Sequence, residues 1–96
     1  MIKKIYKYEI LPDDEIRLLL PKNAEILTVQ TQKNKPCLWA MVDPTAPTEE
    51  RVFCLVGTGH EITPAQLGCF YSYIGTFQIH DAALVFHLFE SVLVSK

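Results

Sequence analysis

Apolar and polar positions alternate in short runs along this chain, most clearly in its second half. Four runs there are rich in β-branched and aromatic residues, and short clusters of Gly, Pro, Asp and Thr separate them. Alternation with a period of two is typical of strands that bury one face, and the short polar breaks favour antiparallel connections. The four runs cover residues 37–43, 51–60, 71–80 and 83–90.

The first part of the chain predicts three further strands. Residues 2–10 alternate aromatic and charged side chains, which indicates a half-exposed edge strand guarded by lysines. Residues 15–20 alternate in the same way. In the strand predicted over residues 24–32, we expect Leu27 and Val29 to point inward.

Turn residues predict how these strands connect. Residues 33–35 are expected to form a hairpin loop, because Asn tolerates positive φ. Residues 43–50 contain two prolines and are expected to form a mobile loop. A capping box with proline at the first helical position predicts one helical turn over residues 63–67, which Gly68 would end. The clearest hairpin is expected to close around residues 81–82.

Together these elements predict an all-β, mainly antiparallel fold in a single domain over residues 1–96. About seven short strands and one helical turn indicate a small barrel or a two-sheet sandwich. The run over residues 37–42 is apolar on both faces, which predicts a central strand or one at an interface. A hydrophobic fraction of 49% is high for a small monomer, so we expect apolar side chains at an interface or pocket and a homo-oligomer.

Charge and cysteine content limit which partners and which cellular location we expect for the protein. The net charge of −2 argues against nucleic acid as a partner. Cys37, Cys54 and Cys69 are odd in number and have no C-x-x-C spacing, so we expect reduced core thiols in a cytoplasmic protein. We expect neither a leader segment nor a membrane partner, because no apolar run approaches the roughly 18 residues that a span requires.

The second half of the chain also contains four motifs that are specific when taken together. They are PCLWAMVDP (36–44), GTGH (57–60), YIGTFQIH (73–80) and ALVFHLFE (83–90). With the KKIYKYEI start, they resemble a family of small proteins of unknown function found in phages, prophages and some bacterial genomes. Many members have two glycines where this chain has Asp81 and Ala82. The resemblance implies a phage or mobile-element accessory protein, and it brings no catalytic residues.

The three histidines do not predict a metal site. If the last hairpin closes around residues 81–82, Thr76 pairs with His87, which then lies roughly 13 Å along the strand from His80. Two ligands of one zinc ion cannot lie that far apart, and His60 could join only one of them. We therefore expect no metal and no cofactor.

The expected function is that of a non-enzymatic binding protein whose target is a host protein, such as a defence component. Loops on a rigid sheet carry function, so the loop over residues 43–51 and the turn at residues 57–60 form the candidate surface. An aromatic contact is expected from Trp39 or Tyr73. The candidate binding residues are Trp39, Asp43, Arg51, Gly57, Thr58, Gly59, His60 and Tyr73.

Two other functions stay open at this point. A nucleotide-like ligand held between protomers would stack on Trp39 or Tyr73, pair its phosphate with Arg51 and meet the amides of residues 57–59. A small hydrolase would depend on His60 and His87, or on a thiol–imidazole pair of Cys54 and His60. No G-x-S-x-G motif supports the hydrolase.

Overall fold

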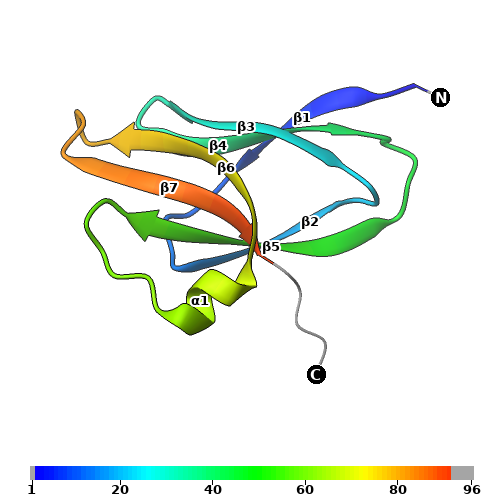
Figure 1. Ribbon diagram of the computed structural model, residues 1–96. Helices are drawn as coiled ribbons and strands as arrows, with labels where there is room; N and C mark the ends of the chain where they lie inside the picture. The colour runs from blue at the N-terminus through cyan, green and yellow to red at the C-terminus, as the bar shows by residue number, and fades with distance from the viewer. Residues whose placement is uncertain (1, 92–96) are drawn as a thin grey trace.

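The computed structural model describes residues 2–91 (Figure 1). Its seven strands form two antiparallel sheets, and one short helix precedes the sixth strand. The predicted all-β fold is confirmed, and of the two expected architectures the structure has the sandwich, because the sheets do not close into a barrel. The elements are β1 (Lys4–Glu9), β2 (Glu15–Pro21), β3 (Glu25–Gln32), β4 (Lys35–Val42), β5 (Thr48–Gly57), α1 (Pro64–Cys69), β6 (Phe70–Ile79) and β7 (Leu84–Ser91).

The strand order places the predicted strands in two layers. One sheet has the order β1-β4-β3 and the other the order β2-β5-β7-β6. The strand that is apolar on both faces, β4, is central in its sheet, as its pattern predicts. The lysine-guarded strand β1 is an edge strand, as expected. Within residues 2–91, no helix is long and apolar enough to cross a membrane.

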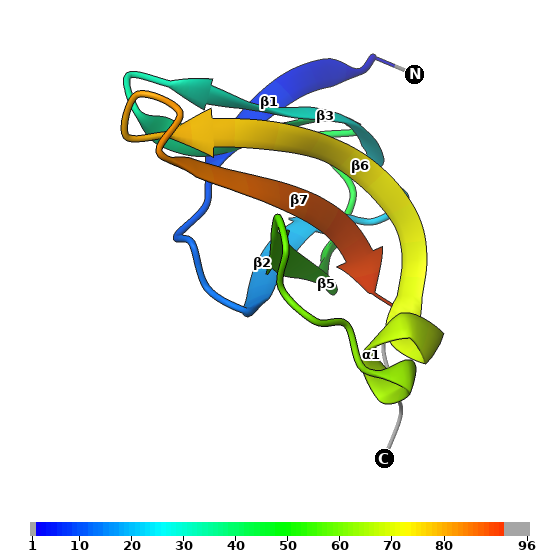
Figure 2. The same cartoon turned by 60° about the vertical axis from the view of Figure 1, so that its left-hand side comes forward.

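The two sheets meet along one side, where β3 lies beside β6 (Figure 2). At this junction the Thr31 hydroxyl donates to the Gln78 carbonyl over 2.6 Å, and the His80 amide donates to Asn34 Oδ1 over 2.6 Å. Gly75 permits the close approach, because a Cβ at this position would lie 3.0 Å from Val29 Cγ1. At the opposite edges, β1 and β2 each pair with one strand, and their outer sides have no neighbouring strand in the described residues.

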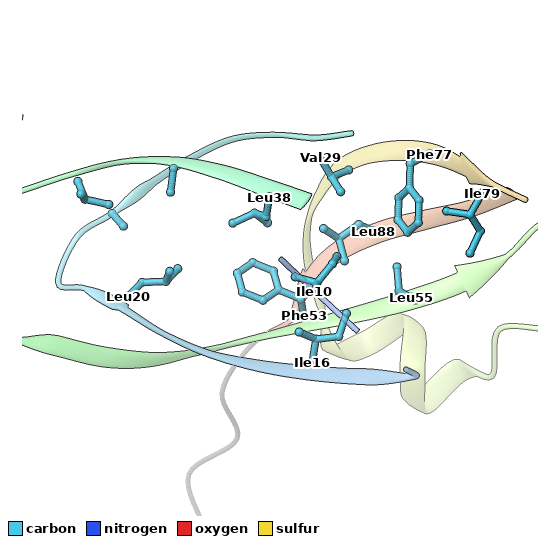
Figure 3. Packing of buried hydrophobic residues seen from close by; sticks show 13 residues of the cluster. Ile10, Ile16, Leu20, Val29, Leu38, Phe53, Leu55, Phe77, Ile79 and Leu88 are labelled. Atoms are coloured by element: carbon cyan, nitrogen blue, oxygen red, sulfur yellow. The ribbon is translucent and has the colours of Figure 1, made fainter. Parts of the chain in front are cut away.

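The core fills the space between the sheets, as Figure 3 shows. Leu20, Leu38, Phe53 and Leu88 come from strands of both sheets and are at most 1% exposed. Burying each such side chain stabilises the fold by about 1.5–3 kcal/mol. The apolar positions of the predicted alternation are therefore the side chains that these strands turn toward the core.

Three expected details are wrong. Leu27 does not point inward: it is 40% exposed, because an irregularity in the pairing between Ile26 and Thr28 shifts the alternation. Ile26 packs against the core instead. The loop expected over residues 43–50 is shorter, since β5 begins at Thr48. The helix also passes through Gly68 to end at Cys69.

The capping box and the last hairpin are confirmed. Thr63 Oγ1 accepts from the Gln66 amide over 3.1 Å, and Gln66 Oε1 accepts from the Thr63 amide over 2.9 Å. Thr76 pairs with His87, and the Ala83 amide donates to the His80 carbonyl over 3.0 Å at the hairpin tip. The sequence-derived register of β6 and β7 is therefore the observed one.

Candidate functional site

The four-stranded sheet has one face on the core and one face turned outward. Its pairing register places side chains of β5, β7 and β6 side by side in two rows on the outward face. Among residues 2–91, no layer of strands covers this side, because the three-stranded sheet packs on the other. We call this surface the open face; it consists of Cys54, Val56, Tyr73, Thr76, His87 and Phe89.

Aromatic rings dominate the open face and its margin. The rings of Phe70 and Phe89 stack with centroids 4.4 Å apart, and Tyr73 tilts against Phe89 at 5.4 Å. Tyr73 remains 58% exposed and the neighbouring Tyr71 remains 74% exposed. Tyr73, which packs against the half-buried Phe89 yet stays exposed, offers apolar area at little entropic cost.

A chain of hydrogen bonds crosses the same face. Tyr73 Oη lies 2.5 Å from Thr76 Oγ1, which lies 2.8 Å from His87 Nδ1. On the other side of the ring, His87 Nε2 lies 2.8 Å from Thr58 Oγ1. With the ring proton of His87 on Nε2, Tyr73 donates to Thr76, Thr76 donates to Nδ1, and Nε2–H donates to Thr58; the other tautomer reverses all three bonds. The imidazole is thus held at both nitrogens.

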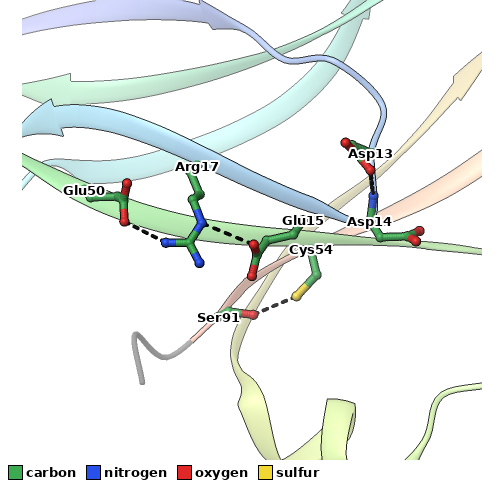
Figure 4. A network of polar contacts seen from close by, with 7 residues as sticks. All are labelled: Asp13, Asp14, Glu15, Arg17, Glu50, Cys54 and Ser91. Atoms are coloured by element: carbon green, nitrogen blue, oxygen red, sulfur yellow. Dashed lines mark hydrogen bonds and ion pairs between the residues drawn. The ribbon is translucent and has the colours of Figure 1, made fainter. Parts of the chain in front are cut away.

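A pocket of about 240 Å³ adjoins the open face between β5, α1 and the start of β2. Cys54, Val56, Cys69 and Phe70 supply much of its wall, and Cys54 Sγ lies 2.7 Å from Ser91 Oγ (Figure 4). The volume is below the roughly 300–1,000 Å³ of most ligand sites. It exceeds the roughly 150 Å³ that accommodates a benzene ring. The pocket therefore suits one inserted side chain better than a whole nucleotide.

This pocket corrects one expectation about the thiols. Cys37 is buried, whereas Cys54 and Cys69 are only half-buried and line the pocket rather than the core. The prediction of core thiols rested on local composition, because Cys54 and Cys69 both have apolar neighbours in the sequence. Their positions on the outward face follow only from the register and from the place of α1.

A charged rim borders the pocket along β2 (Figure 4). Arg17 donates from Nη1 to Glu50 over 2.8 Å and from Nε to Glu15 over 3.2 Å. These hydrogen bonds raise the pKa of Arg17, and the bond donated to Glu50 contributes most. All three side chains are about half exposed, so the ion pairs add little stability. The rim resembles the polar border that surrounds the apolar centre of protein interfaces.

The expected binding residues are spread over the molecule. Of these, Thr58 and Tyr73 are joined through Thr76 and His87. Trp39 lies on the outward face of the other sheet, opposite Lys7. Asp43 accepts from the Thr45 hydroxyl over 2.7 Å and from its amide over 3.0 Å, and these bonds lower the pKa of Asp43. Asp43 therefore shapes its own loop.

Arg51 points toward the core side of β5. It donates two hydrogen bonds to Glu90, of 2.5 and 2.9 Å, and a third of 2.8 Å to the carbonyl of Ala24. The bond to Glu90 is the main cause of the raised pKa of Arg51. Along β5, Arg51 lies roughly 20 Å from Gly57. Within one copy of the chain, Arg51 and the glycine turn therefore cannot hold the same phosphate.

The turn at residues 57–60 places Thr58 on the open face and His60 on the opposite side of β5. Gly59 has a φ of 85°, which glycine adopts without strain. The His60 ring lies over Gly57, where a Cβ would come within 2.8 Å of Cε1. His60 shares a small hollow with Leu55 and Phe86, on the face of β5 opposite to Cys54. The considered thiol–imidazole pair is therefore not formed, and residues 2–91 contain no cluster of metal-ligating side chains.

Sequence reasoning missed Thr76, Phe89 and Phe70 as site residues. It considered His87 only as a metal ligand and as a residue of the hydrolase alternative. The available signal was the Thr76–His87 pair, because residues opposite each other in an antiparallel hairpin share one face. Extending that row to β5 would have required knowing that β5 pairs with β7.

Comparison with known proteins adds a family but no activity. Residues 1–95 match the model of a family described as Domain of unknown function (DUF7352). No curated protein and no solved structure matches the chain.

Proposed function

The chain belongs to the DUF7352 family, and because that family has no assigned function, we propose from the site itself that this is a non-enzymatic binding protein. Its partner is a protein that docks on the open face. The observation that carries this proposal is the Phe70–Phe89–Tyr73 ring cluster, in which Tyr73 is exposed and the two phenylalanines are half-buried, beside a pocket sized for one side chain. Ring clusters of this kind supply much of the binding energy at protein interfaces.

The polar groups of the open face support binding over catalysis. Both His87 nitrogens are bonded to threonine hydroxyls, so the imidazole orients Thr58 and Thr76 rather than activating a water or a thiol. A hydroxyl that already has its partner contributes specificity, because a docked group must match its remaining lone pair. The arrangement therefore favours a surface with fixed geometry.

The class of partner follows from the resemblance. The resemblance to a family expected in phages and prophages directs the search to a host protein, for which a defence component is one candidate. The protein would then act by occupying its target. The three cysteines are unpaired, which supports a cytoplasmic location for this interaction.

The test compares capture from bacterial lysate by matched variants. Tyr73→Ala removes an exposed ring of the open face, whereas Trp39→Ala removes a ring from the opposite side of the sandwich. We expect the wild-type protein and Trp39→Ala to retain the same stoichiometric protein, and Tyr73→Ala to lose at least about tenfold in affinity, as is typical of an aromatic hot spot.

Two results would contradict the proposal. One is capture that Tyr73→Ala leaves unchanged and Trp39→Ala abolishes. The other is a nucleotide that co-purifies with the protein and raises its melting temperature, since a ligand at a hundredfold excess over Kd stabilises the native state by about 2.7 kcal/mol. The second result would favour the nucleotide-like ligand instead.

A further inference from the structure

The edge strand β1 is exposed on both of its faces. Of its six residues only Tyr8 is half-buried, while Ile5 is 60% and Tyr6 is 37% exposed. One side of β1 pairs with β4, and the other side has no strand beside it in the described residues. An unpaired edge with exposed apolar side chains is a template for another strand.

Charge decides which pairing this edge can make with a second copy of itself. A two-fold axis perpendicular to the sheet places one residue opposite its own copy, so that side chains on the same face meet. An axis at Ile5 would set Lys3 against Lys7 of the second copy, and an axis at Lys7 would set the two copies of Lys7 together. Like charges directly opposite each other are destabilising.

An axis at Tyr6 avoids both clashes. An axis at Tyr8 avoids them too, but it pairs only residues 7–9 of β1, because the strand ends at Glu9. The axis at Tyr6 sets Glu9 opposite Lys3 of the second copy, and this ion pair occurs twice in the dimer. It also sets Ile5 opposite Lys7 and brings Lys4 onto Tyr8, where a cation can lie against a ring. In this register the lysines, which otherwise protect an edge from pairing, each meet an opposite charge, a ring or an aliphatic side chain.

We propose that two copies of this chain pair antiparallel through β1 in the register centred on Tyr6. The pairing extends the three-stranded sheet to six strands, in the order β3-β4-β1-β1-β4-β3. Both paired charges also have an intrachain neighbour of opposite sign, since Lys3 lies near Asp43 and Glu9 lies 3.8 Å from Lys35. The dimer uses the sheet opposite to the open face, so it does not depend on the proposed function.

The experiment is sedimentation of the purified full chain over a range of concentrations. We expect a species of twice 10.9 kDa that dissociates on dilution. Glu9→Lys places like charges together at both symmetric pairs and should weaken the dimer about tenfold. The charge swap Lys3→Glu/Glu9→Lys should restore it, which no effect on folding alone would do.

Two further variants keep the outcome decisive. Tyr6→Lys places two lysines at the axis and should give a monomer. Leu19→Lys makes the same kind of change on β2, the free edge of the other sheet, where Leu19 is 65% exposed, and should leave the dimer unchanged. The proposal is overturned by a wild-type monomer at every concentration, by a charge swap that fails to restore the dimer, or by loss of the dimer in Leu19→Lys.

Discussion

At the scale of single residues, the backbone places a strain on the tip of the last hairpin. In the four-residue loop between β6 and β7, His80, Asp81 and Ala82 have φ values of 55°, 55° and 69°, the left-handed conformation that few residues other than glycine adopt without cost. Aspartate tolerates this conformation through local hydrogen bonds, whereas alanine has no such compensation. The glycines expected at this place in relatives would relieve the strain.

We therefore predict that Ala82→Gly stabilises the protein. Relief of the left-handed strain gains about 1–2 kcal/mol, and the greater freedom of glycine in the unfolded chain offsets about 0.4–1 kcal/mol of it. The expected net gain in the free energy of unfolding is about 0.5–1 kcal/mol, measured by urea denaturation.

The neighbouring Ala83 provides the matched control, because its φ is not positive. Ala83→Gly should lower the free energy of unfolding by about 0.5–1 kcal/mol, since only the entropic effect remains. Equal destabilisation by both glycine substitutions would show that the tip is not strained.

At the scale of elements, Arg51 connects three segments of the sandwich. Its guanidinium bonds Glu90 on β7 and the carbonyl of Ala24, which precedes β3, so β5 is tied to its own sheet and to the other. The Arg51 and Glu90 side chains are 18% and 12% exposed. A bidentate pair with so little solvent is stronger than the exposed pairs of the rim.

Removing either partner should therefore destabilise the fold. We expect Arg51→Met and Glu90→Leu each to lower the free energy of unfolding by about 2–3 kcal/mol, because each leaves a charge unpaired. The double variant should lose clearly less than the sum of the two. A double-mutant cycle measures this difference, and additive losses would show that the pair is not coupled.

At the scale of the whole molecule, the sequence predicts the strands better than it predicts how they assemble. Alternation located the strands, and turn chemistry set the register of Thr76 against His87. The pairing of β5 with β7 joins distant segments, and nothing local in the sequence encodes it. That pairing decides that Cys54 faces outward and that Arg51 meets Glu90.

The same limit explains the candidate site. Thr58 and Tyr73 were expected as contacts for separate reasons, and only the sheet brings them to one hydrogen-bonded chain. The position of Trp39 on the opposite sheet could not be foreseen, because a strand that is apolar on both faces does not reveal which face is covered. Leu27 was misplaced by an irregular strand pairing that the alternation does not reveal.

The most direct test of the account is to map the captured partner onto the isotope-labelled protein by amide chemical shifts in solution. We expect the largest changes at Thr58, Tyr73, His87 and Phe89, in β6, β7 and the adjoining turn. Amides of β4 around Trp39 should change little. Changes that cluster on β4 and β3 while the open face keeps its shifts would contradict the account.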